Sequence, residues 1–123
     1  PQRNLANELP ILHNACEAYK IWQQLLQQFP RISRYTLGAK IDTIFTEVIE
    51  LMLAAGYAPK QYKAGIVRKA SSKFDALKLF MRIAWELEYL DHKQYARVST
   101  PLDAVGKMLG GWLKQVQAIP DSQ

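Results

Sequence analysis

Apolar residues recur every three or four positions along most of the chain, which is the spacing of one buried face of an α-helix. Four such stretches follow one another, at about residues 9–28, 35–55, 60–90 and 91–118. Helix-stopping residues separate the first three: Pro30 follows the first stretch, and Gly56 and Pro59 follow the second. No alternating apolar–polar run bounded by hairpin turns competes with these helices.

Short connections separate the four stretches, so consecutive helices are expected to pack as antiparallel neighbours. The sequence therefore predicts an all-α fold, an antiparallel up-down four-helix bundle. The bundle domain is expected to cover residues 9–118, between an N-terminal tail of residues 1–8 and a C-terminal tail of residues 119–123. With 123 residues, the chain is long enough for one domain with a core of its own.

Several residues predict local details of the helix ends. Thr36 is a candidate N-cap for the second helix, and Gly38 marks a place where another helix or chain comes close. Asp91 and Gln94 have the spacing of a capping box at the start of the fourth helix. Pro101, inside that helix, is expected to kink it or to split off a short first helix.

The third stretch is apolar over more of its circumference than one bundle face requires. The residues outside its core-facing stripe are Leu79, Phe80, Ile83, Leu87 and Leu90. One explanation is a central helix surrounded by the rest of a compact monomer. The other is a subunit interface, because each helix of a four-helix bundle keeps an outer face. We expect Leu79, Phe80, Ile83 and Leu87 to form such an interface.

Charge is concentrated in one part of the chain. The net charge is +5 and the isoelectric point is about 9.4, a balance that favours anionic partners. Residues 60–82 hold seven basic residues against one acid, a balance of +6, and residues 31–40 add three more basic residues. Tyr35, Tyr57 and Tyr62 lie near these charges, and an exposed aromatic ring can stack on an unpaired base. A solvated basic face with a purely structural role explains the same pattern.

Residues for catalysis are sparse. His13 and His92 are the only histidines and have no ligand-spaced partner, and Cys16, although close to His13, flanks an apolar stripe. The Glu-x-x-His pairs of di-iron bundles and the glycine-rich phosphate loops do not occur. We therefore expect no enzyme, no catalytic residue, no metal site and no cofactor. A single cysteine, the lack of an apolar signal core and the lack of a membrane-spanning run together favour the cytoplasm.

Three segments resemble a known family. They are FPRISRYTLGAKIDTIFTEVIELMLAA, KASSKFDALKLFMRIAWELEYLDHKQYARV and VGKMLGGWLKQV, and RYTLG (34–38) and GKMLGGWLK (106–114) are their most specific parts. They are similar to small four-helix-bundle proteins of two groups. One group is the accessory variability protein of diversity-generating retroelements. The other group is encoded in intervening sequences of bacterial 23S ribosomal RNA genes. The resemblance spans about residues 9–116.

This resemblance implies a basic, non-enzymatic homopentameric ring. In the retroelement branch, it implies a protein that binds RNA or DNA and the reverse transcriptase and serves mutagenic retrohoming. The residues expected to carry the nucleic-acid contact are Arg31, Arg34, Lys40, Lys69, Lys73, Lys78 and Arg82. Arg34 is expected to meet a phosphate or a carboxylate at one bundle end. The alternative is an oligomeric protein-interaction scaffold of the ribosomal intervening-sequence branch, without a direct role on nucleic acid.

Overall fold

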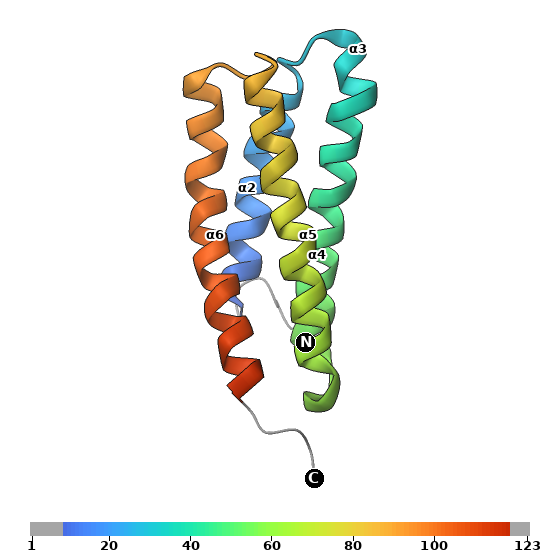
Figure 1. Cartoon of the computed structure of the whole chain (residues 1–123), viewed down its shortest axis with the longest axis vertical. Coiled ribbons are helices and arrows are strands. Elements are labelled where there is room, and N and C mark those ends of the chain that lie inside the picture. The colour runs from blue at the N-terminus through green and yellow to red at the C-terminus, as the bar shows by residue number, and fades with distance from the viewer. Residues whose placement is uncertain (1–8, 119–123) are drawn as a thin grey trace, which may run out of the picture.

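The computed structural model describes residues 9–118 and is an up-down bundle of four long helices (Figure 1). The long helices are α2 (Pro10–Leu26), α4 (Ala39–Tyr57), α5 (Lys60–Glu86) and α6 (His92–Ala118), and α3 (Arg31–Ser33) and the π-helical turn η1 (Arg34–Gly38) precede α4. No strand occurs within residues 9–118. The structure therefore confirms the predicted all-helical bundle. Among the helices of this part of the chain, none has the length and apolar character that a bilayer crossing requires.

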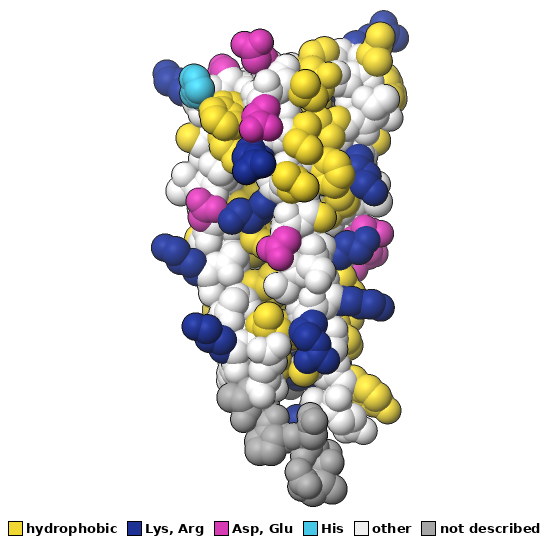
Figure 2. Space-filling model, in the orientation of Figure 1, with side chains coloured by type: hydrophobic (Ala, Val, Ile, Leu, Met, Phe, Trp, Pro, Cys, Tyr) yellow, Lys and Arg dark blue, Asp and Glu magenta, His cyan; other side chains and the backbone are white. Residues whose placement is uncertain are grey.

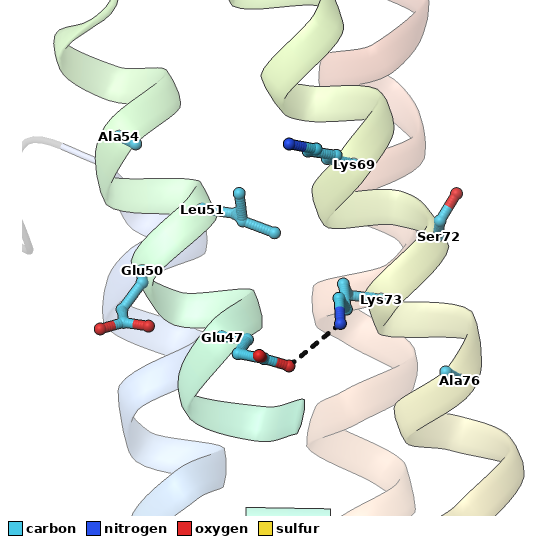
Figure 3. A pocket seen from close by; sticks show the side chains of 8 residues that line it. All are labelled: Glu47, Glu50, Leu51, Ala54, Lys69, Ser72, Lys73 and Ala76. Carbon is cyan, nitrogen blue, oxygen red and sulfur yellow. Dashed lines mark hydrogen bonds and ion pairs between the residues drawn. The ribbon is translucent and has the colours of Figure 1, made fainter. Parts of the chain in front are cut away.

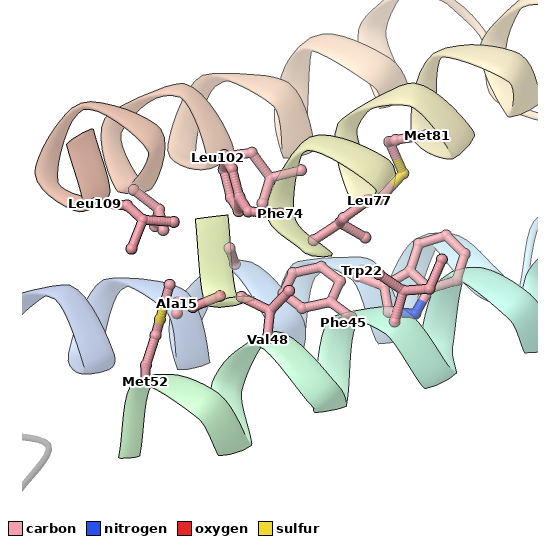
Figure 4. Packing of buried hydrophobic residues seen from close by; sticks show 14 of the residues in the cluster. Ala15, Trp22, Phe45, Val48, Met52, Phe74, Leu77, Met81, Leu102 and Leu109 are labelled. Carbon is pink, nitrogen blue, oxygen red and sulfur yellow. The ribbon is translucent and has the colours of Figure 1, made fainter. Parts of the chain in front are cut away.

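The core runs along the bundle axis and takes side chains from all four long helices (Figure 4). The buried side chains include Trp22 of α2, Val48 of α4 and Leu77 of α5. Phe45 and Met52 of α4 are buried as well. Each helix packs against more than one neighbour, and its buried face is therefore wider than one row of side chains.

The second helix begins earlier than the sequence indicated. Pro30 precedes α3, and the chain continues through η1 into α4 without a break, so Thr36 lies inside a helical turn and the predicted N-cap is wrong. The prediction for Gly38 is confirmed: a Cβ atom there would lie 2.6 Å from Leu26 Cδ1 and 3.2 Å from the Ser33 carbonyl oxygen. Only glycine lets the end of α2 approach this closely.

The junction between α5 and α6 combines two capping motifs. The Tyr89 N–H donates to the Ala84 carbonyl and the Glu88 N–H to the Trp85 carbonyl, which is the Schellman pattern, and Glu88 takes the left-handed conformation with φ 64°. The predicted capping box is confirmed, because the Gln94 N–H donates to Asp91 Oδ1 and the Asp91 N–H donates to Gln94 Oε1.

In this half of the chain, one expectation is wrong and one of two alternatives for another is excluded. Leu90 is buried, with 1% of its surface exposed, because the turn after α5 folds its side chain back onto the core. Of the two alternatives expected at Pro101, the split does not occur, since α6 is one helix from His92 to Ala118, and the kink stays a prediction. The glycines of α6 approach no other backbone within the described chain: Gly106 faces the ring of Phe74, and Gly110 and Gly111 have open space where a Cβ would be.

A polar cluster joins α2 to α4. Asp42 Oδ1 accepts hydrogen bonds from the Tyr19 hydroxyl at 2.8 Å, Trp22 Nε1 at 3.1 Å and Gln23 Nε2 at 2.7 Å. Gln23 Nε2 also donates to the Tyr19 hydroxyl oxygen. Since Trp22 is fully buried, this carboxylate is the acceptor that satisfies its indole N–H.

Candidate nucleic-acid interface

The bundle divides the seven predicted basic residues among three places. Arg31, Arg34 and Lys40 belong to α3, η1 and the start of α4, at one end of the bundle (Figure 1). Lys69 and Lys73 lie on the side of α5 that faces α4. Lys78 and Arg82 lie on a different side, and Lys78 is directed towards α6. The structure therefore does not gather these residues into one surface.

At the α3 end, the guanidinium group of Arg34 is engaged by the protein itself. Its Nε donates to the Phe29 carbonyl oxygen at 3.1 Å and its Nη2 to the Gln27 carbonyl oxygen at 3.0 Å. These carbonyl groups lie at and just beyond the C-terminal end of α2, where a positive charge is favourable. Arg34 thus caps α2, and its partners are backbone carbonyl groups in place of the expected phosphate or carboxylate.

Between α4 and α5 lies an open groove of about 660 Å³. Leu51, Ala54 and Ala76 give it an apolar lining. In Figure 3, Lys69 points into the space between the two helices, and Lys73 Nζ lies 3.1 Å from Glu47 Oε1. Both side chains of this ion pair are solvent-exposed, so the pair contributes at most about 1 kcal/mol to stability.

The third group faces α6 and the solvent. Lys78 Nζ lies 3.4 Å from Asp103 Oδ1, and Arg82 Nε lies 3.8 Å from Glu86 Oε2. All four side chains are about half exposed, so these pairs also contribute little to stability. Because each cation already has a carboxylate beside it, this side of α5 presents less net positive charge than its lysine and arginine content suggests.

Folding creates a basic end, of which the predicted set included only Lys69 and Lys73. The helices α5 and α6 are antiparallel and meet near their middles, where Gly106 faces Phe74, so the N-terminal half of α5 lies beside the C-terminal half of α6 (Figure 1). The cations in these two half-helices, apart from Lys69 and Lys73, are Lys60, Lys63, Arg68, Lys107 and Lys114. No ion pair joins any of these five, or Lys69, to a carboxylate within residues 9–118. We call these five cations, with Lys69 and Lys73, the basic end.

Figure 2 shows Lys and Arg side chains over the lower half of the bundle, with few acids among them. The sequence carried a signal for part of this surface. Lys107 and Lys114 are seven residues apart and therefore share one face of α6. Their position beside α5, however, depends on how the two helices pack.

An apolar band lies on the upper half of the same view in Figure 2. Leu79 and Leu87 are 47% and 53% exposed, and Phe80 and Ile83 are half-buried. The structure therefore places these four side chains outside the tightly packed core, as expected. Their role in assembly stays a prediction.

The residues considered for catalysis are separated. His13 is exposed and Cys16 is half-buried on α2. His92 lies at the start of α6, where its Nδ1 accepts a hydrogen bond from Trp85 Nε1 at 3.1 Å. The ring of Trp85 also stacks on Tyr95, with centroids 4.9 Å apart. His92 is thus part of an aromatic cluster that packs the end of α5 against α6.

Comparison with known proteins supports the family suggested by the sequence motifs. No curated protein sequence matches the chain. The family model described as bAvd-like matches residues 15–116, which cover most of the four-helix bundle and both of the most specific motifs. The chain is therefore a member of the bAvd-like family, the family of the accessory variability protein.

Proposed function

We propose that this protein is a non-enzymatic, nucleic-acid-binding accessory protein of a diversity-generating retroelement. In this proposal it acts in the cytoplasm as a homopentamer, binds RNA or DNA through basic surfaces and associates with the reverse transcriptase during mutagenic retrohoming. Membership in the bAvd-like family supports the biological setting. The observation that carries the binding role is the basic end, where α5 and α6 bring together cations that are far apart in the sequence.

Binding of this kind depends on phosphate neutralisation. Lysine and arginine side chains that contact phosphates release condensed counterions, so the affinity falls as the salt concentration rises. A contact with about five phosphates of a duplex gives a slope of about −4.5 in a plot of log affinity against log salt. Contacts to phosphate do not depend on the identity of the bases, so we expect the protein to bind nucleic acid with little sequence preference.

The experiment measures binding of a labelled structured RNA and a matched DNA duplex at several salt concentrations. Lys69→Glu reverses one charge of the basic end and is expected to lower the affinity and flatten the salt slope by about one. Lys93→Glu is the matched control, because Lys93 is an exposed cation at the opposite end of α6. Equal losses in the two variants would contradict a specific role for the basic end.

Complete absence of binding at low salt would refute the nucleic-acid role. The basic end would then be available to an acidic protein surface, as in the scaffold alternative. Association with the reverse transcriptase is tested separately, by co-purification of the two proteins after nuclease treatment. Loss of the complex after that treatment would mean that nucleic acid alone joins them.

A further inference from the structure

Two large aromatic side chains stand in solvent at the turn between α4 and α5. Tyr57, the last residue of α4, is 60% exposed, and Tyr62, in the first turn of α5, is 61% exposed. Neither ring takes part in an aromatic pair within the described chain, where the paired rings belong to the core and to the end of α5. More than half of each side chain's surface is thus accessible to a planar ligand.

The backbone of this turn holds both tyrosines in place. Ala58 and Pro59 are extended, with φ/ψ of −69°/145° and −56°/151°, and the proline ring restricts its own φ. The Tyr62 N–H donates to the Pro59 carbonyl oxygen at 2.9 Å, which anchors the first turn of α5. The tyrosines are five positions apart in the sequence, so their Cα atoms lie within about 18 Å of each other.

Several cations lie near Tyr62 along α5. Lys60 and Lys63 lie in the same first turn of α5 as Tyr62, and Lys69 follows Tyr62 by seven residues on the same helix face. The first turn of α5 contains no acid and has no side-chain cap. The nearest carboxylate of α4 along the chain is Glu50, seven residues and therefore about 10 Å before Tyr57.

There is also room beside Tyr62. Gly65 follows it by three residues, so the two positions are neighbours on the surface of α5. A Cβ atom at Gly65 would have one neighbour, the Arg68 Nη2 atom, at 4.0 Å. A flat group on the ring of Tyr62 therefore meets no bulky side chain at that position.

We infer that the α4–α5 turn binds an unpaired nucleic-acid strand, with bases stacked on Tyr57 and Tyr62 and phosphates bound by Lys60, Lys63 and Lys69. This inference rests on the proposed function and specifies its ligand. A duplex keeps its base faces covered by neighbouring base pairs, whereas an unpaired strand offers them to aromatic side chains. Every base can stack on an aromatic ring, so the site is expected to prefer unpaired strands over duplexes without preferring a particular base sequence.

The test compares a labelled unpaired oligothymidine with a duplex of the same length by fluorescence anisotropy at one fixed salt concentration. Replacement of Tyr57 or Tyr62 by alanine is expected to weaken binding of the unpaired strand by about five- to 150-fold and to leave duplex binding nearly unchanged. Replacement by phenylalanine keeps the ring and is expected to retain the affinity.

Tyr35 supplies a matched control, because it is 75% exposed but lies at the opposite end of the bundle. Tyr35→Ala is expected to leave oligothymidine binding unchanged. If both strand types bind with equal, salt-dependent affinity and the alanine variants at Tyr57 and Tyr62 behave like Tyr35→Ala, the stacking site is refuted while the proposed function stands. If neither strand type binds at low salt, both proposals fail.

Discussion

Replacement of Asp42 by alanine tests how the bundle satisfies its buried polar groups. One carboxylate oxygen of Asp42 accepts hydrogen bonds from three side chains of α2. Among these donors, the indole N–H of Trp22 belongs to a side chain with no exposed surface, whereas Tyr19 and Gln23 are half-buried and can turn towards water. The variant therefore leaves one donor without an acceptor and two donors with weaker partners.

The expected loss follows from these differences. A buried donor without an acceptor costs about 1–3 kcal/mol, and we assign about 2 kcal/mol to Trp22. Replacement of the other two hydrogen bonds by contacts with water costs roughly 1 kcal/mol together. The free energy of unfolding should thus fall by about 3 kcal/mol. For a domain of this size, each kcal/mol changes the melting temperature by about 4 °C, so we expect a decrease of roughly 12 °C.

Thermal unfolding measures this change, at one fixed protein concentration because the proposed assembly would make the melting temperature depend on concentration. Asp103→Ala is the control: it also removes a carboxylate, but from an exposed pair with Lys78, and should cost at most about 1 kcal/mol. A double-mutant cycle with Tyr19→Phe should show a coupling energy above about 0.5 kcal/mol. A loss of less than 1 kcal/mol in Asp42→Ala, or strict additivity in the cycle, would refute the argument.

The same cluster predicts a dependence on alkaline pH. The pKa of Tyr19 is raised above its ordinary value of 10.0, mainly by burial and to a smaller extent by the hydrogen bond to Asp42. Folding therefore favours the protonated phenol. This contribution to stability is complete below pH 10 and is lost as the pH rises through the raised pKa. Because Tyr19→Phe has no phenol to ionise, it should lose less stability than the unmodified protein as the pH rises above 10, the ordinary pKa of tyrosine.

Three further substitutions test other parts of the bundle. Glu88→Gly should raise the free energy of unfolding by about 1 kcal/mol, since glycine relieves the left-handed conformation at φ 64°; a lower melting temperature would contradict this. Gly38→Ala should lower the free energy of unfolding by about 1–3 kcal/mol, because the new Cβ meets Leu26 and the Ser33 carbonyl group. An unchanged melting temperature would mean that α2 shifts freely. Leu79→Glu should weaken self-association in light scattering more than it lowers the melting temperature, and an unchanged oligomer would exclude Leu79 from the interface.

Local patterns predicted much of the fold correctly. The ends of α2 and α4 follow from Pro30 and Pro59, and the Asp91–Gln94 capping box lies within one turn of the chain. Such signals act between residues at most four positions apart, so they can be recognised without knowing what packs nearby. The prediction at Thr36 failed because Pro30 already starts the helix, and the preference of one residue for a cap is weaker than the continuity of the helix.

The candidate interface was less predictable, because charge along a helix does not reveal which helix lies beside it. Lys69 and Lys73 were expected to act with Arg34, yet Arg34 caps α2 near the other end of the bundle. Lys107 and Lys114 were not expected, yet antiparallel packing brings their half of α6 beside the N-terminal half of α5.

The sequence by itself determined the helical class, the helix stops, the excess of positive charge and the motifs that led to the bAvd-like family. All of these are properties of single residues or of short spacings. Only the tertiary structure decided which cations share a surface and which apolar residues stay outside the core. It also decided that Tyr35 lies at the opposite end of the bundle from Tyr57 and Tyr62. These relations depend on the rotation and register of whole helices, which many weak side-chain contacts set together and no short stretch of sequence encodes.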